Sequence, residues 1–327
     1  MARALAVTLL AGIACGSDAP PPPPVARAWE IMGTVVTVGA WSGGRKGEGG
    51  AGADTGRLTR ALDQAYDSLR LVDSLLSTYR DSSEISRINR GRGTRDAERV
   101  SETFAVVLRE ALAVARASHG AFDPTLKDWR GVVFDSARGA VRLGRGLALD
   151  FGGIAKGYAL DRATLALRGI ADSAVWSIGG QLLFLGMRGG REVGIPDPDN
   201  SLQLAALVRV PAGTVSVSTS SQAERPGHLV DPRTGRAAAR CGVRSVTAIA
   251  PTGMAADAWS TAFFVMGCDS ALALVRARRL PGIDLVCIDR TVRWSAGLEG
   301  AVALPTDSAA RGPAPGRPPA PAPARAP

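Results

Sequence analysis

The sequence predicts an α+β fold in which largely antiparallel sheets pack against a few helices. Segments rich in β-branched residues outnumber the segments with helical periodicity, and several of them are neighbours in sequence. Neighbouring strands favour hairpins over the alternation of strand and helix that builds a doubly wound parallel sheet. The chain has 327 residues, of which 46% are hydrophobic and 21% charged, so it can bury a sizeable core in one large or two medium domains.

Helices are predicted where apolar residues repeat at steps of three and four, which places them on one helical face. The first repeat is Leu58, Leu62, Ala65, Leu69, Val72 and Leu76, and the second is Phe104, Leu108, Ala111 and Ala115. Ser101 is the expected N-cap of the second helix, and Gly120 is expected to terminate it. A third helix is expected from Met254 to Met266, ending at Gly267.

Strands are expected where β-branched and aromatic residues cluster between turn-forming residues. The predicted strands are 34–38, 132–134 with 140–143 as a hairpin, 182–185, 206–210, 215–218, 246–250, and 285–288 with 292–294. Residues 42–56 are rich in Gly and polar residues, which predicts a flexible loop.

Both ends of the chain are expected to lie outside a folded domain of residues 25–306. Residues 1–14 have the basic start and the short apolar run of a signal peptide, too short to span a bilayer. Cys15 follows small residues, as at a bacterial lipoprotein cleavage site, with an ordinary secretory signal as the alternative. Residues 15–24 would then form a lipidation site and a stiff Pro-rich tether. Residues 307–327, almost all Ala, Pro, Arg and Gly, are expected to be a disordered tail.

Charge and composition argue against a nucleic-acid-binding protein, and the few Cys and His residues argue against a zinc site. The net charge is +9, but the arginines are scattered, aromatic residues make up 5%, and no nucleic-acid motif is present, so we expect no nucleic-acid partner. Cys241, Cys268 and Cys287 are widely spaced in apolar segments, which favours buried free thiols over a metal site. The two histidines, His119 and His228, are too few for a His-rich zinc site.

The segment LDFGGIAKGYALD (149–161) carries a phosphate-binding pattern. Asp150 ends an apolar run, glycines follow, and Lys156 precedes a helix-like repeat. A strand, a glycine turn and a helix start present backbone N–H groups and a positive helix end to a phosphate, and a lysine adds a point charge. The spacing fits neither a P-loop nor a GxGxxG motif. A tight turn that leads into a buried helix is the alternative.

Asp257 and Thr261 lie four residues apart on the otherwise apolar third helix, so they face the same way. Polar groups in such surroundings need partners. One solution is internal, with Thr261 bonded back to a carbonyl and Asp257 near the helix N-terminus. The other is a hard cation, which takes oxygen ligands from carboxylates, hydroxyls and carbonyls.

Several short polar segments are each typical of turns: GAFDPTL (120–126), HLVDPRTG (228–235) and STSS (218–221). In their order along the chain, together with 149–161, they resemble the ApbE family, the FAD:protein FMN transferases. The further segments that carry the resemblance are IMGT (31–34), LLSTYRDSSEISRIN (75–89), SIGG (177–180) and SVTAIAPTGMAADAWSTAFFVMG (245–267). The resemblance covers nearly the whole folded chain and implies an ApbE-like flavin transferase fold.

The resemblance also implies a reaction and its residues. The family cleaves the pyrophosphate of FAD and transfers FMN to a Thr or Ser hydroxyl of an acceptor protein, releasing AMP. By motif, the FAD site would be lined by Met32, Tyr79, Ala121, Phe122, Asp123, Asp150 and Lys156. The Gly153 carbonyl, Asp257 and Thr261 would hold Mg²⁺, and His228 matches the histidine suggested to assist the acceptor hydroxyl, so His228 and Asp257 are the implied catalytic residues.

Two departures and two alternatives accompany the resemblance. Gly153 stands where some members have Ala or Thr, which matters little for a carbonyl ligand, and Ser221 stands where Gly is frequent. One alternative is an FAD pyrophosphatase that gives FMN and AMP, and the other is a non-enzymatic, lipid-anchored FAD-binding protein.

Acceptors in the family are typically subunits of membrane redox complexes, so we expect a bacterial cell-envelope protein, anchored by lipid outside the cytoplasmic membrane.

Overall fold

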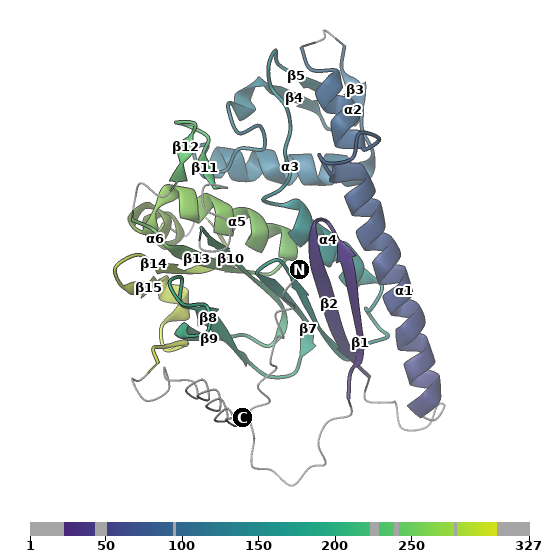
Figure 1. Cartoon of the computed structure of the whole chain (residues 1–327), viewed down its shortest axis with the longest axis vertical. Helices are drawn as coiled ribbons and strands as arrows, with labels where there is room; N and C mark the ends of the chain where they lie inside the picture. Colours follow the sequence, from purple (N-terminus) through teal and green to yellow (C-terminus); the bar gives the residue numbers. More distant parts are fainter. Residues whose placement is uncertain are drawn as a thin grey trace, which may run out of the picture.

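The computed structural model describes residues 23–42, 51–93, 96–222, 229–238, 242–277 and 280–305. The expected signal peptide, Cys15, His228, Cys241 and the C-terminal tail lie outside the described residues. The fold is mixed, with helices packed on antiparallel sheets, which confirms the predicted α+β class (Figure 1). Within the described ranges, none of the helices is both long enough and apolar enough to cross a membrane.

A large antiparallel sheet runs through the middle of the molecule and has eight strands among the described residues. In spatial order they are β1 (Val25–Ile31), β2 (Thr34–Trp41), β6 (Ser173–Ile178), β7 (Gln181–Met187), β10 (Gly213–Ser221), β13 (Ser245–Ala250), β14 (Asp284–Ile288) and β15 (Val292–Trp294). The hairpins β1–β2, β6–β7 and β14–β15 join strands that follow one another directly in the chain.

Three small sheets complete the β structure of the described part. One contains β8 (Arg191–Pro196), β9 (Leu204–Val210) and β16 (Val302–Ala303), and another contains β3 (Glu98–Arg99), β4 (Val132–Asp135) and β5 (Ala140–Leu143). The third is the hairpin of β11 (Val230–Asp231) and β12 (Arg236–Ala237). The predicted hairpin of 132–134 with 140–143 is confirmed as β4–β5.

Helices occur where the periodicity predicts them. The described helices are α1 (Ala51–Leu76), α2 (Glu84–Arg90), α3 (Glu102–Ala117), α4 (Ala155–Leu165), α5 (Gly253–Met266) and α6 (Cys268–Arg276). Ser101 caps α3 by accepting the Phe104 N–H, and Gly267 ends α5 with a φ of 85°. The loop predicted over 42–56 is wrong from Ala51 onward, because the polar, Gly-containing start of α1 continues into an apolar repeat.

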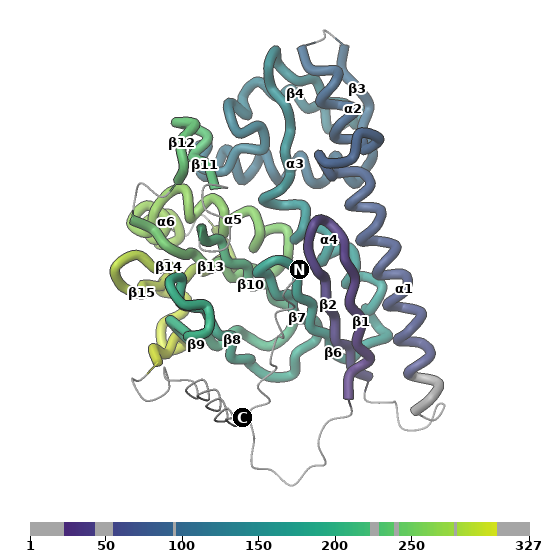
Figure 2. The backbone as a smooth tube through the Cα atoms, in the orientation of Figure 1, coloured from purple at the N-terminus to yellow at the C-terminus, as the bar shows by residue number. Residues whose placement is uncertain are grey.

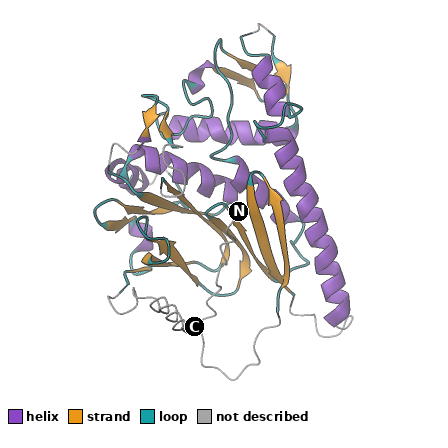
Figure 3. Cartoon of the chain, viewed as in Figure 1, coloured by secondary structure: helices purple, strands orange, loops and turns teal. Residues whose placement is uncertain are grey.

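The main sheet separates two apolar layers, as Figures 2 and 3 show. Helices α1, α4 and α5 cover one face, where the larger core packs Val38, Trp176 and Val246 of the sheet against helical residues. The small sheet of β8 and β9 covers the other face, where Val217 and Ile249 enter a second core. Strand alternation divides the side chains between the two layers.

A disulfide joins the start of α6 to the main sheet. Cys268 and Cys287 are bonded, with their Cα atoms 5.7 Å apart, and both residues are buried. The predicted free thiols are therefore wrong for these two residues. Their separation of 19 residues does not reveal that α6 folds back onto β14, which brings the two side chains together.

Candidate active site

The glycine segment before α4 is held by bonds from elsewhere in the chain. The side chain of Asn89 accepts the Leu149 N–H at 2.7 Å and donates to the Leu149 carbonyl at 2.9 Å, and the Asp150 N–H donates to the Pro124 carbonyl at 2.7 Å. The phosphate-binding pattern begins with a strand before the glycine turn. This part of the prediction is wrong, because residues 147–150 belong to no strand. The Asn89 side chain supplies the backbone partners of Leu149 that a neighbouring strand would have supplied.

Asp257, in the second turn of α5, connects α5 to the start of α4. One carboxylate oxygen, Oδ2, accepts the Gly157 N–H at 3.0 Å, and the other, Oδ1, lies 3.4 Å from the Lys156 ammonium. The Asp257 side chain is 6% exposed. Burial of a carboxylate this deep is costly unless it has hydrogen-bonding and charged partners of this kind.

Two further oxygen atoms in this region, the Gly153 carbonyl and the Thr261 hydroxyl, have no hydrogen bond from the residues that the structure describes. Because the Gly157 N–H donates to Asp257, it does not donate to the Gly153 carbonyl, and no other described N–H does so. Thr261 lies one turn after Asp257, and its Oγ1 would be 3.2 Å from a Cβ placed on Gly153. Among the described residues its hydroxyl makes no hydrogen bond; the back-bond to a carbonyl is made by Ser260 instead, to Asp257 at 2.9 Å. The structure thus brings together the three predicted metal ligands.

Lys156 connects this cluster to the turns of the main sheet. Its Nζ donates to the Gly152 carbonyl at 2.8 Å, and its aliphatic stem would lie 3.6 Å from a Cβ on Gly179, in the SIGG turn. Thr34 Oγ1 would be 3.8 Å from the same point. The IMGT and SIGG turns therefore meet beside Lys156, although they lie far apart in sequence.

Met32 occupies the β1–β2 turn, at the end of the hairpin next to the SIGG turn. Met32 and Gly33 have positive φ angles of 54° and 70°, as in a tight two-residue hairpin turn. The Met32 side chain is half-buried and packs against the main core. The hairpin turn thus presents an apolar side chain at the Lys156 end of the sheet.

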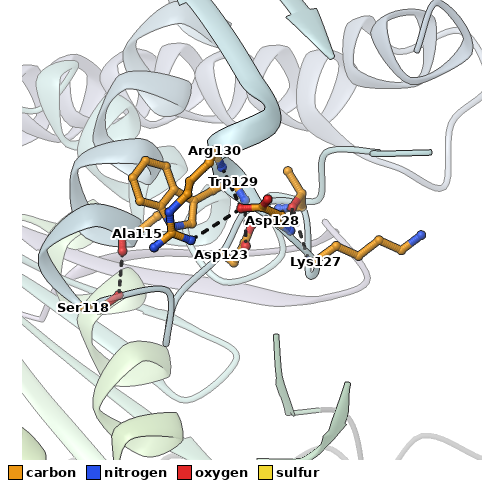
Figure 4. Close-up of polar contacts among 8 residues, drawn as sticks. Ala115, Ser118, Asp123, Lys127, Asp128, Trp129 and Arg130 are labelled. Atoms are coloured by element: carbon orange, nitrogen blue, oxygen red, sulfur yellow. Dashed lines mark hydrogen bonds and ion pairs between the residues drawn. The ribbon is translucent and has the colours of Figure 1, made fainter. Parts of the chain in front are cut away.

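The GAFDPTL segment forms the wall next to Gly153. Ala121, Phe122 and Asp123 are buried, and the Phe122 ring would be 3.2 Å from a Cβ on Gly153. The Asp123 carboxylate is occupied within its own loop: it accepts the N–H and the hydroxyl of Thr125, both at 2.7 Å, and the Trp129 N–H at 2.9 Å (Figure 4). Asp123 thereby fixes the shape of the wall that Phe122 presents.

Asp150 has a similar local role, because its Oδ1 accepts the Gly152 N–H at 2.7 Å and closes the turn before α4. Tyr79 is different. It lies in the loop after α1, and its side chain is 97% exposed, so the structure does not bring it against the cluster around Lys156.

His228 lies outside the described residues, but the segment that follows it is described. Arg233 donates to the Asp231 carboxylate at 2.8 and 2.9 Å, and this hydrogen bonding holds the pKa of Asp231 below its usual value. The stem of Arg233 would be 3.8 Å from a Cβ on Gly120, and its guanidinium donates to the Val265 carbonyl at 3.5 Å. The HLVDPRTG segment is thereby attached to both GAFDPTL and the end of α5.

The motifs do not assign roles to several residues around this site. The Arg130 guanidinium lies 5.0 Å from the ring centre of the Trp129 indole (Figure 4), and the Arg116 guanidinium lies 5.7 Å from it. Asp161, within the 149–161 motif, accepts the N–H groups of Gly253 and Met254, and burial raises its pKa to about 6. Asp161 contacts the start of α5, and Trp129 contacts Arg116 of α3. No local sequence pattern reveals these contacts.

Comparison with known proteins matches this arrangement to one family. The model of the ApbE family matches residues 32–133 and 126–286, which include every described segment of the site. The chain belongs to the ApbE family. The resemblance predicted from the motifs is confirmed.

Relatives and solved structures of the ApbE family extend the match over most of the chain. A Treponema pallidum protein named FAD:protein FMN transferase is 31% identical and aligns with 83% of this chain and 87% of its own length. A Haemophilus influenzae protein of the same name is 25% identical over 69% of this chain and 80% of its own length. The ApbE protein of Thermotoga maritima superposes with a TM-score of 0.72 at 24% identity, covering 85% of this chain and 99% of that protein. The apo flavinyl transferase ApbE of Pseudomonas stutzeri gives a TM-score of 0.69 at 24% identity, covering 84% and 95%, so the predicted fold is confirmed.

Proposed function

We propose that this ApbE-family protein is an FAD:protein FMN transferase, which moves FMN from FAD to a Thr or Ser hydroxyl of an acceptor protein and releases AMP. The observation that carries the proposal is the cluster of Asp257, Thr261 and the Gly153 carbonyl beside Lys156, in a chain whose curated relatives bear that name. The cluster offers both a hard-cation site and a positive charge for a pyrophosphate.

The residues present fit a magnesium ion. The cluster has a buried carboxylate, a hydroxyl and a carbonyl, and the latter two have no hydrogen bond from the described residues; all three are oxygen ligands, the type that hard cations prefer. Mg²⁺ bound there would neutralise pyrophosphate oxygens and stabilise the departing phosphate. Asp257, Thr261 and Gly153 are the residues that would hold it.

The remaining residues bind and orient FAD. Lys156 would place its ammonium against the pyrophosphate, since its side chain is 25% exposed and its Nζ lies at the cluster. Met32, Ala121 and Phe122 supply apolar surface, while Asp123 and Asp150 hold the turns that carry it. Tyr79 is proposed to reach FAD from its exposed loop.

The transfer itself is one substitution at phosphorus. The acceptor hydroxyl oxygen forms a bond to the phosphorus of the FMN half, and the bond from that phosphorus to the bridging oxygen breaks. AMP leaves with the bridging oxygen, and the hydroxyl proton passes to a base, for which His228 or a nearby Asp is the candidate. Such transfers depend mainly on positioning and charge neutralisation, which the buried cluster provides.

We further propose that the protein acts in the bacterial cell envelope, outside the cytoplasmic membrane, anchored by lipid at Cys15. The Cys268–Cys287 disulfide supports this location, because structural disulfides persist in oxidising compartments. An acceptor on a membrane redox complex would be within reach of a tethered enzyme.

The test incubates the protein with FAD, Mg²⁺ and a threonine-bearing acceptor domain and follows the intact mass of the acceptor. We expect a mass gain of one FMN phosphoester, absent with a chelator or with an acceptor whose threonine is changed to alanine. Free FMN that forms equally with and without acceptor would identify a pyrophosphatase instead. FAD that stays intact with Mg²⁺ and a competent acceptor would identify a binding protein.

A further inference from the structure

Asp161 makes an unusual pair of contacts between two helices. It lies in α4, and its Oδ1 and Oδ2 accept the N–H groups of Gly253 and Met254 at 2.6 and 2.8 Å. These are the first two residues of α5, whose N–H groups have no partner within their own helix. One side chain of α4 thus completes the hydrogen bonding at the start of α5.

The exchange between the two helices is reciprocal. Asp257 of α5 accepts the N–H of Gly157, in the first turn of α4, at 3.0 Å. Each helix therefore gives a carboxylate to the backbone of the other. Two of the residues that donate these N–H groups, Gly157 and Gly253, are also where the two backbones touch. A Cβ on Gly157 would overlap the Gly253 carbonyl and lie 2.8 Å from the Met254 nitrogen.

The sheet fixes the same turn of α5 from a third direction. Gln181, fully buried at the start of β7, donates from its Nε2 to the Gly253 carbonyl at 2.8 Å and to Ser216 at 3.0 Å. The first turn of α5 is thus held by a side chain of α4, by a side chain of the sheet and by direct backbone contact.

This fixation matters because the proposed cation ligands are divided between the two helices. Asp257 and Thr261 follow on α5, whereas Gly153 lies just before α4. Their relative placement depends on how α5 begins against α4, and a functional site tolerates little displacement of its ligands.

We infer that Asp161 is a positioning residue for the cation centre: it fixes the start of α5 against α4, so that Asp257 and Thr261 face the Gly153 carbonyl. The inference rests on the proposed function, because it takes these three residues as the cation ligands. Asp161 itself would touch neither FAD nor the ion.

The test measures cation binding directly, with Mn²⁺ as the probe and electron paramagnetic resonance to count free Mn²⁺. In Asp161→Asn the amide oxygen can accept only one of the two N–H bonds, and the amide NH₂ opposes the other donor. We expect Mn²⁺ binding at least tenfold weaker than in the wild type, while FAD affinity measured with a chelator present changes less than twofold.

Thr252→Ala is the matched control, because Thr252 caps α5 from within the same helix by accepting the Ala255 N–H at 3.2 Å. This variant should lower the melting temperature, as Asp161→Asn does, yet keep Mn²⁺ affinity within twofold of the wild type. If Asp161→Asn does not fold, Asp161→Ser, whose hydroxyl accepts one of the two N–H bonds, is compared in its place.

Two outcomes would overturn the inference: an Asp161 variant that binds Mn²⁺ as the wild type does, or a Thr252→Ala protein that loses as much affinity as the Asp161 variant. A wild-type protein that binds no Mn²⁺ would instead contradict the cation centre of the proposed function.

Discussion

At the scale of single residues, Asp257 is the point on which the candidate site depends. Its two oxygens divide their contacts between the Gly157 N–H and the Lys156 ammonium, and the hydroxyl of its helical neighbour Thr261 makes no hydrogen bond within the described part of the chain. The spacing of Asp257 and Thr261 on an apolar helix was enough to predict that they act together. Their partner in the proposed cation site, Gly153, is connected to them by no helical pattern.

Removal of the Asp257 carboxylate should abolish Mg²⁺-dependent turnover. In Asp257→Ala the cation loses its one charged ligand, and Lys156 loses its counter-ion. FMN transfer measured by acceptor mass should fall at least a hundredfold at saturating FAD and Mg²⁺. Asp63→Ala, at an exposed position of α1, is the control and should keep wild-type activity. Persistent turnover in the Asp257 variant would show that the metal assignment is wrong.

The buried carboxyl of Asp161 gives stability a defined pH dependence. Burial raises its folded-state pKa from 3.8 to about 6, against the opposing effects of two backbone N–H bonds and the Arg168 charge, while the Asp257 charge raises it slightly. Between these values the folded state binds the proton more tightly than the unfolded state. The contribution of Asp161 to the free energy of unfolding therefore falls as the pH rises from about 4 to 6 and is constant above that.

The measurement compares urea unfolding of the wild type and Asp161→Asn, because the amide does not titrate. The wild-type free energy of unfolding, relative to the variant, should decrease by about 2 kcal/mol between pH 4 and pH 7, most of the equivalent of the pKa shift. A difference that stays the same at both pH values would mean that Asp161 titrates normally in the folded protein.

At the scale of elements, the contact of α4 with α5 depends on glycine. A Cβ on Gly157 would overlap the Gly253 carbonyl, so Gly157→Ala must push the two helices apart. We expect a loss of about 2 kcal/mol or more in the free energy of unfolding, as for other overpacked interiors, although alanine is the better helix former. Gly189→Ala is the control, because a Cβ there meets no atom within 4 Å. Equal urea midpoints for the two variants would contradict the close helix contact.

The longer and more regular a helix is, the more readily its sequence pattern predicts it. The long amphipathic helices α1 and α3 follow from periodicity, and the hairpin β4–β5 follows from its β-branched residues. The seven-residue helix α2 has only Ile85 and Ile88 to bury, too few for a detectable repeat. The glycine segment before α4 has a strand-like sequence, yet Asn89, 60 residues away, takes the place of a strand partner. Contacts over such distances, like that of Asp161 with Gly253 across 92 residues, leave no local signal.

At the scale of the whole molecule, the Cys268–Cys287 disulfide closes the C-terminal part of the fold. It restricts the unfolded chain over a separation of 19 residues, which corresponds to about 3 kcal/mol in the chain-entropy model. The double variant Cys268→Ala, Cys287→Ala should lose stability of this order in urea unfolding under non-reducing conditions. Addition of a reductant should then destabilise the wild type but leave the variant unchanged; a reductant effect of the same size on both proteins would argue against the bond.

The pairing of β2 with β6 has a consequence for how the chain is made. Val36 lies opposite Ile178, so the N-terminal hairpin must wait for about 140 further residues before its inner edge is covered. A chain that emerges from a ribosome, N-terminus first, would therefore carry an unpaired β edge until those residues have been made. Closure over so long a loop is slow. Delayed closure would leave a period in which other chains can pair with that edge.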